Sequence, residues 1–187
     1  MPTPRQPDRD DGGVALAVCL LMDRAGERAV RALWRRLEEE GAATPLTHTH
    51  GLHVPHLSYA VLREFDVDAV RDAVDGLTSG GPVRLWADAV AHFRRGRMAL
   101  APAVGADLLL RQERVVDAVV ATGADLHHHY LPGRWVPHVS LATHVRGRDL
   151  PAATTAVHDV LPLELVADRA ALVDSGTGER WPLRGLP

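Results

Sequence analysis

Val-Pro-His-Leu-Ser-Tyr-Ala at residues 54–60 and Val-Pro-His-Val-Ser-Leu-Ala at residues 136–142 are two copies of one short pattern. Residues two apart in an extended chain point to the same side, so each copy predicts a strand with His and Ser on one face. The core face of these strands is predicted at Leu57, Val61, Val139, Leu141 and Val145. Two such strands facing each other would direct two imidazoles and two hydroxyls at one small anion.

The two histidines of the pattern, His56 and His138, are candidates for an acid–base pair. Imidazole has an unperturbed pKa of about 6.5, so one ring can give a proton to a leaving oxygen while the other takes one from water. Ser58 and Ser140 add hydroxyls that can donate to phosphoryl oxygens. In-line displacement at phosphorus places the attacking and leaving oxygens on opposite sides, which suits two imidazoles flanking one phosphate.

The rest of the chain predicts strands alternating with helices. Val30, Leu33, Trp34 and Leu37 follow the spacing of one helix face, with Trp34 in the core. The other expected elements are a buried strand at 14–22, a helix at 67–77 capped by Asp66, a hairpin at 83–100 turning at 94–96, helices at 106–122 and 151–160, and a closing hairpin at 163–183. In the helix at 106–122, the inward residues are expected to be Leu109, Val116 and Val120.

Length and composition suit one domain, or two close lobes, expected over residues 13–187 after a disordered N-terminal tail at 1–12. The net charge of −3 gives no global signature of double-stranded DNA or membrane binding. The apolar run at 14–22 is far shorter than the roughly 20 residues that a membrane span requires. Cys19 is the single cysteine, so no internal disulfide can form, and a cytoplasmic location is expected.

The sequence contains no lysine, and all 21 basic residues are arginine. This absence excludes a phosphate-binding loop of the Gly-Lys-Ser/Thr type, a lysine Schiff base and a covalent lysyl-adenylate.

The paired tetrapeptides at 56–59 and 138–141 resemble the two His-x-Thr/Ser-x motifs of the two-histidine phosphoesterase superfamily, which includes bacterial 2′-5′ RNA ligase and cyclic phosphodiesterase proteins. Residues 130–141, with the lead-in Trp135-Val136-Pro137, resemble the second motif of that superfamily, and the resemblance covers residues 13–187. One departure is serine at both hydroxyl positions, where threonine is frequent. Serine keeps the donor but loses the methyl group that stiffens χ1.

The resemblance implies a bilobed α+β fold, with two pseudo-twofold-related antiparallel or mixed sheets, helices packed outside and a central cleft. It implies a monomeric, metal-independent phosphodiesterase without a cofactor, which opens 2′,3′-cyclic phosphates or cleaves or joins 2′-5′ linkages. The substrate would be an RNA end or a small nucleotide. The implied catalytic residues are His56, Ser58, His138 and Ser140, with His138 activating water and His56 protonating the leaving ribose oxygen.

Arg134 and Tyr130 are candidates for substrate contacts, because a guanidinium can bind phosphate and an aromatic ring can stack on a base. Trp135 is a weaker candidate for stacking. Arg94, Arg95 and Arg97 are interpreted as a solvated hairpin rather than an RNA-binding surface.

Two other functions remain open from the sequence. The first is a non-catalytic module of the same fold that binds a nucleotide or an RNA end. The second is a metal-binding protein, since histidines gather at 48–53 and 127–129. Neither histidine group has cysteine or carboxylate partners at a recognisable ligand spacing, so no metal site is predicted.

Overall fold

A computed structural model describes residues 15–187, and the tail expected at 1–12 lies outside this range. The strands and helices are β1 (Leu16–Met22), α1 (Arg24–Glu39), β2 (His56–Leu62), α2 (Val67–Asp75), β3 (Val83–His92), β4 (Met98–Pro102), α3 (Ala106–Ala121), β5 (Val139–Ala142), α4 (Leu150–His158), β6 (Leu163–Asp174) and β7 (Arg180–Pro182). Short 3-10 turns lie at Arg94–Gly96, His128–Tyr130 and Gly147–Asp149.

The strands form one sheet in the order β1-β2-β5-β4-β3-β6-β7, and β1 also pairs with β6. All these pairings are antiparallel. Strand β6 pairs with β3 over residues 163–167 and with β1 over residues 167–174. The expected α+β fold is therefore confirmed, while the two expected sheets are joined through the long strand β6.

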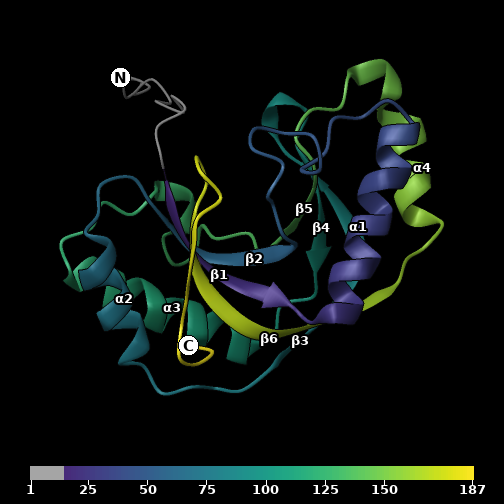
Figure 1. The fold of residues 1–187 in the computed structure, drawn as a ribbon. Helices are drawn as coiled ribbons and strands as arrows, with labels where there is room; N and C mark the ends of the chain where they lie inside the picture. Colours follow the sequence, from purple (N-terminus) through teal and green to yellow (C-terminus); the bar gives the residue numbers. More distant parts are fainter. Residues whose placement is uncertain (1–14) are drawn as a thin grey trace, which may run out of the picture.

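The helices pack in two pairs outside the strands (Figure 1). Helix α1 lies beside α4, and α2 lies beside α3 at the opposite end of the molecule. Helix α1 contacts β1, β5 and β6, whereas α3 contacts β2. The two histidine strands are thus each backed by a helix from a different pair.

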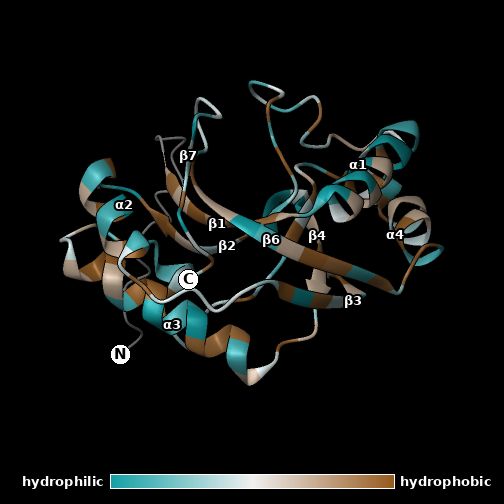
Figure 2. Ribbon diagram, turned by 60° about the horizontal axis from the view of Figure 1, so that its bottom comes forward, coloured by the Kyte–Doolittle hydropathy of each residue, from teal (hydrophilic) through white to brown (hydrophobic). Residues whose placement is uncertain are grey.

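The helix ends follow their sequence signals. Asp66 caps α2 by accepting a hydrogen bond from the Ala69 amide at 3.0 Å, as expected, and Asp23 caps α1 in the same way through Gly26. Beyond α1 and α3, Gly41 and Gly123 take positive φ angles of 80° and 85°. Helices α1 and α3 alternate between polar and apolar residues along their turns (Figure 2), and the apolar side of α1 is the predicted one, with Trp34 in the core.

The inward face of α3 differs from the prediction. Leu109 and Val120 are 44% and 48% exposed, whereas Val116 is buried as expected. The buried face also includes Gln112, whose amide nitrogen donates to the backbone oxygens of Tyr59 and Tyr130 at 3.2 and 2.7 Å. A buried polar residue interrupts the hydropathy pattern of this helix, so the pattern indicated the wrong face.

The alternation along β2 also departs from the prediction at one residue. Tyr59 is an extra residue opposite β1, because Cys19 pairs with Ser58 and Val18 pairs with Ala60. This bulge shifts the alternation that follows it. Val61 is therefore half-buried and Leu62 fully buried, while Leu57, Val139, Leu141 and Val145 lie in the core as predicted.

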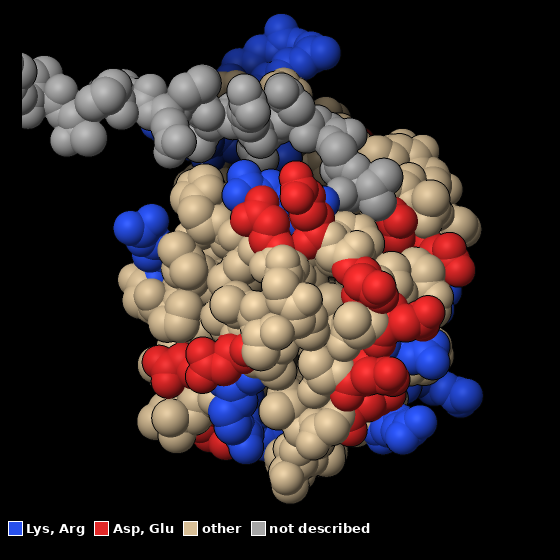
Figure 3. Space-filling model, turned by 90° about the vertical axis from the view of Figure 1, so that its left-hand side faces the viewer, with Lys and Arg blue, Asp and Glu red and all other residues tan. Residues whose placement is uncertain are grey.

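Charges of both signs are mixed on the side of the molecule that carries α2 and α3. Figure 3 shows acidic side chains interspersed with arginines on this side, and no continuous basic surface on the part that is visible. Within residues 15–187, no helix has the length and apolar character that crossing a membrane requires.

Candidate functional site

The pairing of β2 with β5 places the four motif residues on one face of the sheet. Leu57 lies opposite Val139 in an antiparallel ladder, so His56 lies across from Ser140 and Ser58 across from His138. Cβ atoms directly opposite are about 5 Å apart, and diagonal neighbours about 7–8 Å. We call this side, with His56, Ser58, His138 and Ser140, the histidine face. All four residues are half-buried, so solvent can reach them.

The two imidazoles are held by matching hydrogen bonds. His56 Nδ1 lies 2.7 Å from the Val54 carbonyl oxygen, and His138 Nδ1 lies 2.8 Å from the Val136 carbonyl oxygen. A carbonyl can only accept, so each Nδ1 carries a proton and donates it. Nε2 is then the nitrogen that gains or loses a proton in both rings. Each ring can accept a proton when neutral and donate one when charged.

Two tryptophans fix the backbone of the motif serines in a corresponding way. Trp34 Nε1 on α1 donates to the Ser140 carbonyl at 2.9 Å, and Trp135 Nε1 donates to the Ser58 carbonyl at 3.0 Å. Both indoles are buried. Trp135 therefore has a structural role here, and sequence reasoning missed the bond of Trp34, because hydropathy spacing does not reveal a donor.

The surroundings of His56 include the buried thiol of Cys19. Cys19 lies opposite Ser58 on β1, fully buried, with its Sγ 3.5 Å from Ser58 Oγ. Burial by itself lowers the pKa of His56, but its interactions with the Cys19 sulfur and its hydrogen bond to the Val54 carbonyl raise this pKa to about 9. His56 is therefore protonated at neutral pH.

Replacing Cys19 by Ala is expected to lower the pKa of His56, because the hydrogen bond that favours the charged ring is lost while the burial remains. NMR titration of the imidazole measures this pKa directly. Cys19→Ser, which keeps a hydrogen-bonding group, is expected to shift the pKa less. An unchanged pKa in Cys19→Ala would contradict the role given to the thiol.

His138 has different neighbours from those of His56. Its pKa is lowered by burial first, and further by the positive charges of His56 and Arg97, although its bond to Val136 acts the other way. The Phe93 ring packs against it with the centroids 5.0 Å apart. The two imidazoles occupy corresponding positions but have different pKa values. At neutral pH, His138 is therefore neutral and His56 is charged.

Tyr130 lies at the histidine face, and its contact with substrate stays a prediction. Burial, and after it the nearby Cys19, raise the pKa of its hydroxyl to about 12, while a hydrogen bond with Ser58 and the charge of Arg97 oppose the rise. Arg134 is exposed on the turn before Trp135, and its role stays a prediction. Arg97 was interpreted as solvated, and although it is exposed, its charge acts on both His138 and Tyr130.

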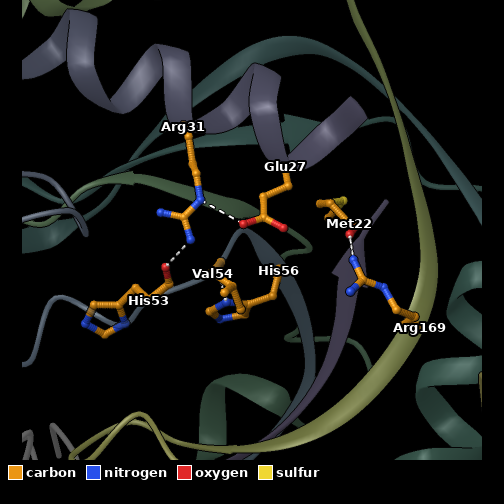
Figure 4. A network of polar contacts seen from close by, with 7 residues as sticks. All are labelled: Met22, Glu27, Arg31, His53, Val54, His56 and Arg169. Atoms are coloured by element: carbon orange, nitrogen blue, oxygen red, sulfur yellow. Dashed lines mark hydrogen bonds and ion pairs between the residues drawn. The ribbon is translucent and has the colours of Figure 1, made fainter. Parts of the chain in front are cut away.

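A polar network from α1 supports the segment that leads into β2 (Figure 4). Arg31 is bound by Glu27 at 2.8 Å and donates to the His53 carbonyl at 3.1 Å. The next carbonyl along the chain, that of Val54, accepts the bond from His56. Helix α1 therefore holds the backbone segment that accepts the hydrogen bond of the His56 ring.

The remaining histidines do not form a metal centre in the part of the chain that the structure describes. No group of three or more His, Cys, Asp or Glu side chains within residues 15–187 has an arrangement suited to a metal ion. The His53 ring is tilted against that of His50, with the centroids 4.2 Å apart, and its pKa is lowered to about 4 by burial first and then by His50, His56 and His48. His53 is therefore a neutral neighbour of the histidine face.

Comparisons with known proteins agree with this geometry. A solved structure titled as a phosphoesterase matches with a TM-score of 0.61 and 15% identity, over 92% of this chain and 96% of that one. LigT of E. coli, complexed with NADP+, matches with a TM-score of 0.58 and 14% identity, over 92% and 95%. The PDE domain of MHV ns2 matches with a TM-score of 0.51 and 13% identity, over 90% and 97%. At such low identity these likenesses show the fold alone.

Among curated proteins, no sequence matches the chain significantly. The family comparison is decisive, because residues 22–179 match the 2′-5′ RNA ligase superfamily. This range includes both His-x-Ser motifs and every element from α1 to β6. The chain therefore belongs to the 2′-5′ RNA ligase superfamily, the two-histidine phosphoesterase group that its paired motifs resemble.

Proposed function

We propose that this protein is a metal-independent phosphodiesterase that opens 2′,3′-cyclic phosphates of RNA ends or small nucleotides. The same chemistry would cleave 2′-5′ linkages, or join them in reverse. The observation that carries the proposal is the pair of imidazoles on one face, each with Nδ1 bound to a carbonyl and Nε2 left for proton transfer. Together they supply an acid and a base to one phosphate.

In the proposed reaction, His138 Nε2 takes a proton from a water molecule whose oxygen attacks phosphorus. The bond from phosphorus to one ribose oxygen breaks, and His56 Nε2 gives its proton to that oxygen. Ser58 and Ser140 donate hydrogen bonds to the non-bridging phosphoryl oxygens. The lowered pKa of His138 and the raised pKa of His56 support this division, since a base must begin neutral and an acid must begin charged.

The pH dependence follows from these two shifts. We expect kcat/KM to rise with pH as His138 loses its proton, at a pKa below the ordinary value of about 6.5. It should fall again as His56 loses its proton near pH 9. The two limbs report apparent values of the coupled pair. A profile whose upper limb lies at or below neutral pH would contradict the assignment of His56 as the acid.

The substrate class is tested by incubating the protein with 2′,3′-cyclic nucleotides, cyclic-phosphate-ended oligonucleotides and 2′-5′ dinucleotides, all in the presence of a chelator. The expected result is a single monophosphate product, 2′ or 3′, from the cyclic phosphates. Tight binding without any product would indicate a non-catalytic module instead. Turnover that appears only when a divalent metal is added would contradict the metal-independent mechanism.

A further inference from the structure

Arg97 stands at the start of β4, next to the strand that carries His138. Ala99 pairs with Ser140, so these two side chains share the histidine face. Arg97 is two residues before Ala99 in extended backbone and points to the same side. On this side of β4, the residue next to Arg97 is Ala99, whose side chain is a single methyl group.

The positive charge of Arg97 affects two residues of the site that belong to different segments. It lowers the pKa of His138, which directly precedes β5, and it opposes the rise in the pKa of Tyr130, which lies in a 3-10 turn. The hairpin that carries Arg97 is held in place, because the Phe93 amide donates to the Arg97 carbonyl at 2.8 Å and the Val145 amide donates to the Gly96 carbonyl at 2.8 Å. A Cβ at Gly96 would lie 2.6 Å from the Val145 carbonyl oxygen, so the contact is close.

Among residues 15–187, no carboxylate forms an ion pair with Arg97. Within residues 15–187 its guanidinium makes no hydrogen bond or ion pair with another side chain, whereas Arg31, Arg111 and Arg169 are each bound. No carboxylate of the described residues contributes to the pKa of His56, His138 or Tyr130. With His56 protonated, His56 and Arg97 contribute two positive charges at the histidine face.

A cyclic phosphate diester has a single negative charge, which one protonated imidazole can balance. A guanidinium beside it is then available for a second anionic group. We propose that Arg97 forms a subsite for a second phosphate of the substrate, beside the histidine face. This inference rests on the proposed function, and it assigns a substrate with a further phosphate next to the cyclic one. That phosphate is either a 5′-phosphate on the same nucleoside or the preceding phosphodiester of an RNA end.

The primary test is binding, which does not depend on turnover. Calorimetry with a nucleoside 3′-monophosphate and with the 3′,5′-bisphosphate of the same nucleoside measures the contribution of the second phosphate. We expect the bisphosphate to bind about tenfold more tightly to the unaltered protein, with a preference that declines as salt is added. In Arg97→Gln the preference should fall to about twofold or less.

Arg84→Gln is the matched control, because Arg84 is exposed on the adjacent strand β3 and contacts only Glu164, at 3.5 Å. This variant should keep the full preference. An equal loss of affinity for both ligands in Arg97→Gln, or a preference that persists there, would overturn the subsite.

Kinetics then separate the two proposals and the two sources of phosphate. The substrates are a nucleoside 2′,3′-cyclic phosphate with and without a 5′-phosphate, and a dinucleotide ending in a cyclic phosphate. If the unaltered protein opens none of them, the proposed function fails, while the binding result still decides the subsite. A preference for the dinucleotide alone assigns the subsite to the phosphodiester of an RNA end, and a preference for the 5′-phosphate assigns it to a small nucleotide.

Discussion

His56→Ala and His138→Ala are each expected to lower kcat/KM for a 2′,3′-cyclic nucleotide by about 10²–10⁴-fold, the range that acid–base groups contribute. In His138→Ala no group of the site takes the proton from water. In His56→Ala the leaving ribose oxygen has no donor. The double variant should be little worse than either single variant, because each removes the same concerted proton transfer.

The fold should survive both substitutions, since both side chains are half-buried and each ring is hydrogen-bonded to a carbonyl of its own segment. Thermal unfolding measured beside activity separates loss of chemistry from loss of structure. His158→Ala, at the exposed end of α4, is the matched control and should retain both activity and stability. Full turnover in either site variant would contradict the acid–base pair.

Trp34→Ala is expected to cost about 3–5 kcal/mol of unfolding free energy, because a large core side chain leaves a cavity. Trp34 is 1% exposed and links α1 to β5 through the Ser140 carbonyl. Trp34→Phe keeps most of the apolar volume but leaves that carbonyl without its donor, at about 1–3 kcal/mol. The Phe variant should also lower kcat/KM, because the backbone of Ser140 is no longer fixed.

Denaturant unfolding measures both stability changes against one control. Trp86 is 51% exposed on β3, so Trp86→Ala should change stability by about 0.5 kcal/mol or less. If Trp34→Ala loses no more stability than Trp86→Ala, the packing described for α1 is wrong. If Trp34→Phe unfolds like the unaltered protein, the bond to Ser140 contributes nothing.

Local patterns were sufficient to predict most of the elements and the four residues of the histidine face. The face of α1, the cap at Asp66 and the two His-Ser strands all depend on spacing within a few residues. Such spacing is a property of one helix or one strand, so it can be recognised before any tertiary contact is known.

The predictions that failed depend on contacts between elements. The buried face of α3 includes Gln112, whose side-chain amide donates hydrogen bonds to carbonyls of two other segments. Val61 leaves the core face because the pairing with β1 inserts a bulge at Tyr59. Arg97 reaches the site only through the pairing of β4 with β5. None of these contacts between elements can be inferred from the periodicity of a single helix or strand.

Contacts between elements also explain why His56 and His138 look equivalent in the sequence but have different surroundings in the structure. Cys19 lies far from His56 in the chain and becomes its neighbour only when β1 pairs with β2. Arg97 and Phe93 come to His138 through another hairpin. The motifs repeat, but their neighbours do not, and the neighbours set the proton affinities.

The proposed reaction requires one phosphate to lie between His56 and His138. A crystal structure of the complex with a nucleoside 3′-monophosphate tests this most directly. We predict that Nε2 of each ring lies about 3 Å from a phosphate oxygen, with the Ser58 and Ser140 hydroxyls on the remaining oxygens. A phosphate bound elsewhere, for example in the surface hollow lined by Arg24, Arg28 and Arg169, with both imidazoles left free, would contradict it.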